Sequence, residues 1–222
     1  MTADEAKREA ALKALELVQP GMTLGLGTGS TAAHFVRGLG LRLKAGLRIA
    51  GAVATSEATA DLARASGVPL LEPGPETRFD LAVDGADEID PALNLIKGGG
   101  GALLREKIVA AAAARFIVIA DAGKRTPRLG RFPLPVEVTP FAWPLTARKV
   151  AEALRAAGCA RDVLSLRYKD GAPFITDGGN HILDCQAALI PEPSALAALL
   201  DATPGVVEHG LFIGLAHEAI VV

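Results

Sequence analysis

Three short segments of the sequence combine glycine with hydroxyl, acidic or basic side chains. They are residues 25–31 (GLGTGST), 83–90 (VDGADEID) and 97–101 (KGGGG). Each lies where an apolar stretch that predicts a strand comes to its end. Because ligands of open α/β sheets bind outside the carboxyl ends of the strands, the sequence predicts a small-molecule site at such an edge.

The first segment has the composition of a phosphate-binding turn. Its glycines let backbone N–H groups approach an anion, and Ser30 and Thr31 add hydroxyl donors at the start of a predicted helix. It differs from a dinucleotide fingerprint, because Ser30 replaces the third glycine and no acidic residue follows about 20 positions later. It also lacks the lysine of a Walker A loop. A plain tight turn between a strand and a helix remains the alternative.

The second segment places two carboxylates at the end of a buried-type strand. Asp84 follows Val83 directly, and Asp87 comes three residues later across a glycine turn. Such groups can accept hydrogen bonds from sugar hydroxyls or move protons. Helix caps, turn-forming aspartates and a Mg²⁺ site are the alternatives. Glu88 and Asp90 are interpreted as solvated or structural.

The third segment has four consecutive glycines, which lose much conformational entropy on folding and suit a backbone that must approach a ligand closely. Lys97 precedes them with a positive charge. Glu106 follows on a predicted helix, near enough to the glycines to reach a bound ligand. The alternative is that Arg105, Glu106 and Lys107 form a solvated helix face.

Composition limits the class of partner. The chain has 222 residues, half of them hydrophobic and 22% charged, which excludes intrinsic disorder. A formal net charge of -2 supplies no basic surface for nucleic acid and no polybasic membrane patch. No apolar run approaches the roughly 18 residues of a membrane span. We therefore expect a small-molecule partner, no nucleic acid and no membrane.

Two further expectations concern the cysteines and the location. Cys159 and Cys185 cannot form a disulfide framework and belong to no metal-binding motif, so they are expected to pack as small hydrophobic residues. The acidic start of the chain lacks the apolar segment of a signal peptide, which favours a cytoplasmic protein.

The pattern of elements predicts an α/β fold with two domains. Strands alternate with helices up to about residue 125, which indicates a mostly parallel, Rossmann-like sheet. A β-α-β-β-α-β order follows, typical of a smaller ferredoxin-like α+β domain. The predicted domains are 1–130 with the tail 207–222, and 131–206. The apolar tail is expected to rejoin the first sheet. The expected strands are 22–26, 49–54, 68–71, 79–83, 116–120, 136–139, 163–167, 181–185 and 206–209.

Taken together, the motifs resemble type A ribose-5-phosphate isomerase. The segments that carry the resemblance are 27–31 (GTGST), 83–88 (VDGADE), 96–100 (IKGGG), 105–107 (REK) and 132–138 (FPLPVEV). They occur in the family's order, and the resemblance covers nearly the whole chain. It implies an α/β domain with a smaller ferredoxin-like domain.

The resemblance also implies an activity and a set of site residues. The reaction is the interconversion of D-ribose 5-phosphate and D-ribulose 5-phosphate by proton transfer through an enediolate, without metal or organic cofactor, in a homodimer or a homotetramer. Glu106 corresponds to the catalytic base, and Asp84, Asp87 and Lys97 to further catalytic residues. The implied substrate-binding residues are Lys7, Thr28, Gly29, Ser30, Thr31, Gly85, Ala86, Gly98, Gly99, Gly100 and Lys124.

Two other classes of function compete with this one. A nucleotide-dependent oxidoreductase is disfavoured by Ser30 in the glycine motif. A non-catalytic sugar-phosphate sensor would need the phosphate-binding turn but has no use for Glu106 beside a glycine loop.

Overall fold

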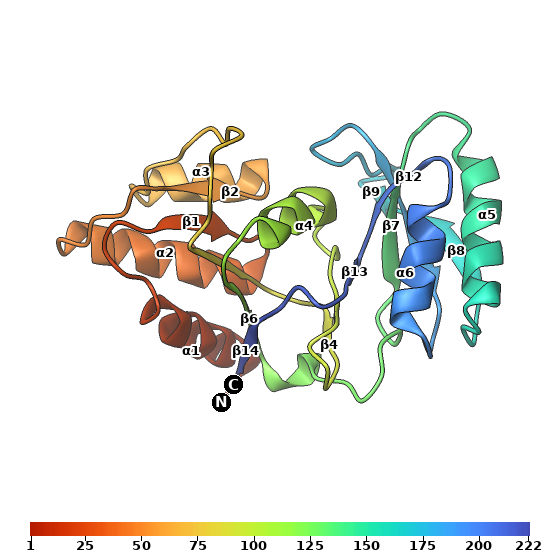
Figure 1. The fold of residues 1–222 in the computed structure, drawn as a ribbon, viewed down its shortest axis with the longest axis horizontal. Helices are drawn as coiled ribbons and strands as arrows, with labels where there is room; N and C mark the ends of the chain where they lie inside the picture. The colour runs from red at the N-terminus through yellow and green to blue at the C-terminus, as the bar shows by residue number, and fades with distance from the viewer. The chain divides into compact units, whose positions relative to one another are not determined.

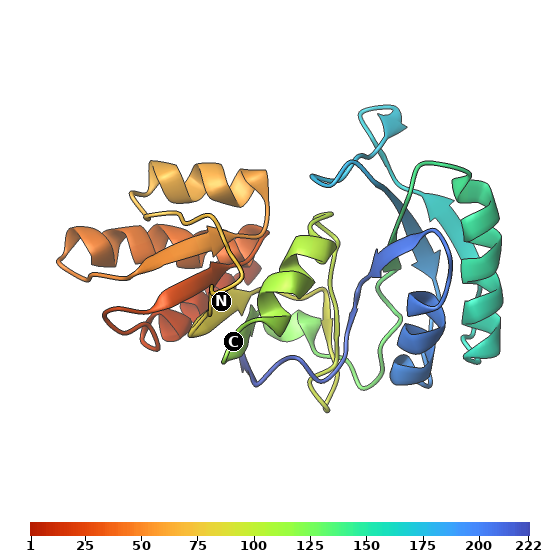
Figure 2. The same ribbon diagram turned by 45° about the horizontal axis from the view of Figure 1, so that its top comes forward.

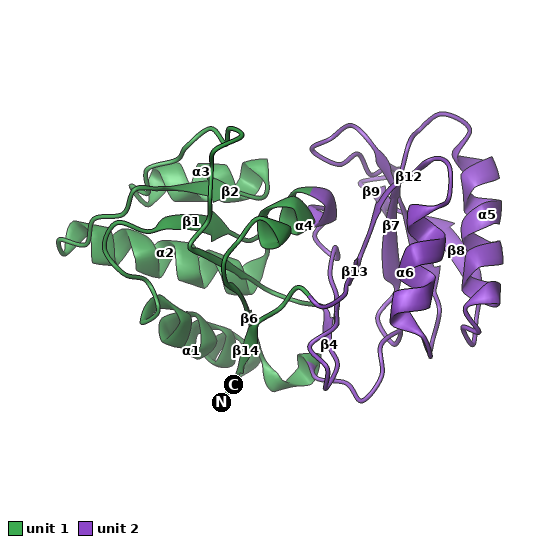
Figure 3. Ribbon diagram, in the orientation of Figure 1, with its two compact units in different colours: residues 1–86, 105–124, 215–222 green, residues 87–104, 125–214 purple.

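The computed structural model describes all residues, 1–222, and the chain forms two compact units (Figure 3). Unit 1 contains residues 1–86, 105–124 and 215–222, and unit 2 contains residues 87–104 and 125–214. The predicted domain boundaries differ from these units mainly in residues 87–104, 125–130 and 207–214. The division into two domains at residues 130 and 206 stays a prediction.

Unit 1 is built on a five-stranded parallel sheet with the order β14-β6-β3-β1-β2 (Figures 1 and 2). Its strands are β1 (Thr23–Leu26), β2 (Gly51–Ala54), β3 (Leu81–Asp84), β6 (Phe116–Ala120) and β14 (Glu218–Val221). The predicted parallel sheet is confirmed, and so is the return of the tail, since β14 pairs with β6. From β1 the chain first adds β2 on one side and then β3 on the other side of β1. The strand order therefore changes direction between β1 and β3, which makes that point the topological switch point.

Helices cover one face of this sheet with small and aliphatic side chains. Helix α1 (Ala3–Leu15) begins with a capping box between Thr2 and Glu5, and it packs against α2 (Ser30–Lys44). Their buried alanines, leucines and Phe35 meet the side chains of β1 in one apolar cluster. Helix α3 (Glu57–Ala65), capped by Ser56, packs beside β2. None of the helices combines the length with the apolar composition that a membrane span requires.

The other face of the sheet receives α4 (Leu103–Ala111), whose residues from Arg105 onward belong to unit 1. Gly25 in β1 allows this close approach, because an added Cβ there would overlap the side chains of Val109 and Ala82. Glycine at this position therefore lets the helix that carries Glu106 lie directly on the strands of the switch point.

Unit 2 contains a four-stranded antiparallel sheet with the order β12-β7-β11-β8. Its strands are β7 (Leu134–Val138), β8 (Val163–Leu166), β11 (His181–Gln186) and β12 (Val206–His209), and its helices are α5 (Trp143–Ala156) and α6 (Pro193–Asp201). Both helices contribute to one apolar cluster with the sheet. The predicted ferredoxin-like order of elements is confirmed. Cys185 lies inside this cluster, and burial raises the pKa of its thiol.

Some short elements differ from the prediction. The expected strand 68–71 is wrong, because only Leu70 forms a bridge, with Ala52. A three-stranded sheet and a hairpin were not predicted, since strands of two residues carry no periodic pattern. The sheet joins β13 (Leu211–Phe212), β5 (Leu95–Ile96) and β4 (Glu88–Ile89), and the hairpin pairs β9 (Tyr168–Lys169) with β10 (Ala172–Pro173).

Glu88, in β4, is structural. Its side chain is 0% exposed, and its carboxylate accepts hydrogen bonds from the N–H groups of Gly130 (2.7 Å) and Phe132 (2.8 Å). The carboxylate thus supplies the acceptor for one buried and one partly buried amide of the same loop.

We predict that Glu88→Ala lowers the free energy of unfolding by about 3 kcal/mol, because two charge-assisted hydrogen bonds are lost and their donors lose their acceptor. The measurement is the urea midpoint followed by circular dichroism. Glu76→Ala, at an exposed position, is the control. Equal midpoints for the two variants would contradict a structural role for Glu88.

Candidate active site

The switch point of unit 1 holds the carboxylate of Asp84. Asp84 ends β3, and its Oδ1 accepts hydrogen bonds from the N–H groups of Thr28 (3.0 Å) and Gly85 (2.7 Å). A Cβ on Gly27 would overlap this carboxyl group, so only glycine fits at that position. Asp84 is 3% exposed and is therefore fixed on the loop that follows β1.

Four hydroxyl groups secure the same loop. Thr28 Oγ1 lies 2.8 Å from Thr55 Oγ1 and 2.9 Å from Ser56 Oγ, while Thr59 Oγ1 lies 3.0 Å from both Ser56 Oγ and the carbonyl oxygen of Gly27. Thr28 donates to Ser56, Ser56 to Thr59, and Thr59 to the carbonyl oxygen of Gly27. The hydroxyl of Thr55 donates to the carbonyl oxygen of Leu26 at 3.1 Å. We call these four side chains the hydroxyl chain.

The hydroxyl chain was not predicted from the sequence. Ser56 caps α3, because its Oγ accepts from the N–H of Thr59 at 3.1 Å. Nothing in the local pattern connected Thr59 with Gly27, 32 residues earlier. The hydroxyl of Thr28 donates within this chain, so the turn is built before any ligand arrives.

The N-terminus of α2 lies next to this turn. Its N-cap is Gly29, which offers no side-chain cap, and its first turn contains no acidic residue. Ser30 is exposed, and the ammonium of Lys7 donates to its Oγ at 3.1 Å. The structure therefore brings Lys7 and Ser30 together beside free helix amides, an arrangement that favours an anion. Thr31 is buried in the same turn.

Lys124 follows the carboxyl end of β6. It lies in a short 3₁₀ helix, η1 (Ala122–Lys124), and is partly exposed. Since β6 neighbours β3 in the sheet, Lys124 belongs to the same sheet edge as Asp84. Gly85 and Ala86 lie beyond Asp84 and are partly exposed.

Glu106 is buried on α4, with 5% of its surface exposed. It lines a cavity of about 10 Å³ together with Asp84, Thr55 and apolar side chains that include Val109 and Phe116. The structure thus brings Glu106 and Asp84 to one small space. The alternative of a solvated helix face is wrong for Glu106.

Arg105, the residue before Glu106, does point to the surface. Its guanidinium pairs with the carboxylate of Glu57 on α3 at 2.8 Å. The Arg105 guanidinium holds the pKa of the Glu57 carboxyl below its usual value.

The remaining predicted residues belong to unit 2. Lys97 is 3% exposed, and its Nζ lies 5.4 Å from the centre of the Phe212 ring, a cation–π contact. Asp87 Oδ2 accepts a hydrogen bond from the N–H of Gly99 at 2.8 Å. Gly99 and Gly100 are exposed, whereas Gly98 is buried. The structure thus joins Asp87 to the glycine loop.

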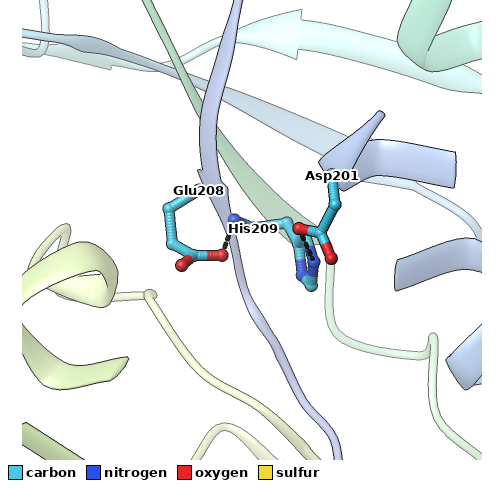
Figure 4. Close-up of side chains that lie close together, drawn as sticks. All are labelled: Asp201, Glu208 and His209. Atoms are coloured by element: carbon cyan, nitrogen blue, oxygen red, sulfur yellow. Dashed lines mark hydrogen bonds and ion pairs between the residues drawn. The ribbon is translucent and has the colours of Figure 1, made fainter. Parts of the chain in front are cut away.

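A group of Asp201, Glu208 and His209 in unit 2 brings together atoms that could ligate a metal ion (Figure 4). Nδ1 of His209 accepts from the N–H of Leu211 at 3.2 Å, so the ring proton is on Nε2, which faces Asp201 Oδ1 at 3.1 Å. A metal-binding histidine presents an unprotonated nitrogen. The hydrogen bonds of His209 to Leu211 and Asp201 therefore indicate a structural contact and not a metal site.

Comparisons with known proteins identify the family of the chain. The family model for ribose 5-phosphate isomerase A (phosphoriboisomerase A) matches residues 51–222. A protein of that name from Parvibaculum lavamentivorans is 57% identical over 221 residues, covering 100% of this chain and 95% of its own. Another from Nitrobacter hamburgensis is 58% identical over 220 residues, covering 99% of this chain and 94% of its own.

Solved structures give the same result. A D-ribose-5-phosphate isomerase in complex with phospho-erythronic acid has a TM-score of 0.91 at 38% identity, with 100% of this chain and 96% of that chain covered. The ribose 5-phosphate isomerase from Plasmodium falciparum has a TM-score of 0.93 at 35% identity, with 98% and 94% covered.

The fold and the comparisons define an α/β enzyme of the aldose–ketose isomerase class. More particularly, the chain belongs to the ribose 5-phosphate isomerase A family. Its function is the isomerisation of ribose 5-phosphate, a reaction of the pentose phosphate pathway, and the non-catalytic sensor is not favoured.

We predict that Thr59→Val lowers kcat/KM for ribose 5-phosphate by about tenfold or more. The substitution keeps the volume but removes the last hydroxyl of the chain, which leaves Ser56 without an acceptor and the carbonyl of Gly27 without its side-chain donor. Steady-state kinetics measure the effect, and Thr59→Ser should restore most of the activity.

The matched control is Thr146→Val in unit 2. Thr59 and Thr146 are both 6% exposed, so the two variants lose the same group at the same burial. An equal effect on kcat/KM in both variants would contradict a specific role of the hydroxyl chain.

Proposed function

We propose that Glu106 is the base that moves a proton between C1 and C2 when D-ribose 5-phosphate and D-ribulose 5-phosphate interconvert. The observation that supports this role is the burial of its carboxylate in a mostly apolar cavity that Asp84 also lines. A base in such a place is shielded from water and is positioned by a helix, which keeps it at a fixed distance from the strands below.

The chemistry requires stabilisation of an anion as well as a base. In the open-chain aldose, Glu106 removes the proton from C2, the C–H electron pair forms the C1–C2 double bond, and negative charge develops on O1. A proton then passes from O2 to O1. Glu106 returns its proton to C1 while the electron pair on O2 forms the carbonyl at C2, which yields the ketose. A C–H group beside a carbonyl is a weak acid, so the enediolate oxygen must be stabilised for the base to act.

We assign that stabilisation to Lys97 and to the glycine loop Gly98–Gly100. Within the loop the N–H of Gly99 already donates to Asp87, so the amide of Gly100 is the donor assigned to the oxygen. A preorganised donor of this kind is worth roughly 3–4 kcal/mol in the transition state. Support comes from the burial of Lys97, which strengthens its electrostatic effect, and from the exposure of Gly99 and Gly100 to a ligand.

The phosphate group is assigned to the turn after β1. Ser30, Thr31 and the α2 amides would donate to it, and Lys7 and Lys124 would supply positive charge. The hydrogen bond between Lys7 and Ser30 supports this assignment, as does the uncapped helix N-terminus. Thr28 and Gly29 complete the turn. Binding energy from this remote group holds the reacting carbons in place.

We assign opening of the furanose ring to Asp84 and Asp87. Each carboxylate accepts at least one backbone N–H, which holds it in a fixed position at the end of a loop. Gly85 and Ala86, between them, would contact the sugar through their backbone.

Several properties implied by the resemblance remain proposals. They are a reaction without metal or organic cofactor, a cytoplasmic location and a homodimer, with a homotetramer as the second option. A pentose phosphate is the proposed small-molecule substrate, and no nucleic-acid or membrane partner is expected.

We predict that Glu106→Gln lowers kcat by about 10²–10⁴, the contribution expected of a positioned base. The affinity for ribose 5-phosphate should change by less than about threefold, because the amide keeps the size of the carboxyl group. Steady-state kinetics and isothermal titration calorimetry measure the two quantities.

The control is Glu152→Gln, at an exposed pair with Lys149 on α5. A near-normal kcat in Glu106→Gln would remove Glu106 from the role of base.

We also predict that solvent deuterium enters C1 of ribulose 5-phosphate during turnover in D₂O, since a carboxylic acid proton exchanges with solvent. Proton NMR of the product measures the incorporation, and a sample without enzyme is the control. Rapid turnover with no deuterium in the sugar would favour a hydride shift or a fully shielded transfer.

A further inference from the structure

Arg167 is a partly buried cation in unit 2 that the sequence analysis did not single out. It follows β8, and its side chain is 14% exposed. Its guanidinium forms a two-point ion pair with Asp184 on β11: Nε lies 2.9 Å from Oδ2, and Nη2 donates to Oδ1. A planar guanidinium held in this way has a fixed orientation.

The same guanidinium binds the glycine loop. Its Nη1 donates to the carbonyl oxygens of Gly98 (2.9 Å) and Gly99 (3.2 Å). Two successive carbonyls of the loop are therefore drawn to one side, toward β8 and β11.

This fixes where the loop's amides point. The chain has no cis peptide bond, and in a trans peptide the C=O and the following N–H point in opposite directions. The N–H of Gly99 accordingly faces away from Arg167 and donates to Asp87 Oδ2 at 2.8 Å. By the same geometry, the N–H of Gly100 faces away from Arg167. No hydrogen bond within the chain uses it.

The guanidinium also changes the strength of these donors. A cation bound to a carbonyl oxygen polarises the whole peptide group and makes its N–H a stronger donor. The surroundings favour this effect, because the ring of Phe174 lies 5.9 Å from the guanidinium carbon and limits access of water.

We propose that Arg167 is a positioning residue for the isomerisation: through the peptide between Gly99 and Gly100 it aims and polarises the N–H of Gly100 as a donor to the enediolate oxygen. This inference rests on the proposed role of the glycine loop. In this proposal the ion pair with Asp184 fixes the orientation of the Arg167 guanidinium. The guanidinium itself does not touch the substrate.

The test is Arg167→Met, which keeps an apolar stem and removes the guanidinium. We expect kcat to fall by at least about thirtyfold, while KM for ribose 5-phosphate changes less than about threefold, since the donor acts on the transition state. Arg155→Met is the control, because Arg155 forms an exposed ion pair with Asp162.

Phospho-erythronic acid, the compound in one related structure, supplies a second readout. Its phosphate lies at one end of a four-carbon chain, and its carboxylate resembles the planar, anionic end of the enediolate. In Arg167→Met its inhibition constant should rise by a factor similar to the fall in kcat/KM. A merely structural role would instead weaken inhibitor and substrate alike.

Two further variants keep the test decisive if Arg167→Met folds poorly. Arg167→Lys keeps the charge but loses the planar group, so it should recover part of kcat. Asp184→Asn keeps Arg167 but loosens it, and should lower kcat with little change in KM.

Unchanged kcat and inhibition constant in Arg167→Met, or equal changes in KM and the inhibition constant, would overturn the proposal. The two proposals can fail separately. If Glu106→Gln is inactive while Arg167→Met keeps its kcat, Glu106 retains the role of base and only the role of Arg167 is lost.

Discussion

The hydrogen bond from the N–H of Thr28 to the carboxylate of Asp84 joins the ends of β1 and β3, and the proposed substrate-binding turn of unit 1 depends on it. It exists only because Gly27 has no side chain where the carboxyl group lies. Gly27 is itself held by its N–H to the carbonyl of Val83 and by the hydroxyl of Thr59 to its own carbonyl. One turn thus sets both the carboxylate of Asp84 and the start of the helix whose amides face the proposed phosphate.

In unit 2 the glycine loop is also fixed by hydrogen bonds from side chains to its backbone. The peptide between Gly98 and Gly99 is held at its N–H by Asp87 and at its carbonyl by Arg167. Backbone amides act as preorganised donors only if their peptide planes cannot rotate, and glycine offers no side chain to prevent rotation. A carboxylate and a guanidinium on opposite sides of one peptide therefore replace the packing that a side chain would have provided.

The sequence predicted those parts of the molecule that have a local signal. The five apolar residues of β6 indicated a strand, and residues 116–120 form it, buried along its whole length. The glycine segments marked the turns at the strand ends, because glycine is costly unless the backbone needs it. Arg167 could not be found in this way. Its partners, Gly98 and Gly99, lie 69 and 68 residues away, and an arginine near a strand end looks like an ordinary surface residue. Thr59, whose bond to Gly27 spans 32 residues, was missed for the same reason.

If the amide of Gly100 is a donor to the enediolate, the ferredoxin-like sheet contributes to the reaction by fixing the groups that orient this amide. Arg167 and Asp184 lie on or beside the paired strands β8 and β11, so the pairing of these strands fixes the distance between the two charged groups. A loop of similar sequence without that sheet would have the same glycines but no fixed carbonyls, and its amides would have to be ordered during the reaction. Ordering a residue's backbone costs about 1–2 kcal/mol, so two loosely held peptides would cancel much of what one oriented amide contributes. The sheet meets this entropic cost when the chain folds, before the substrate binds.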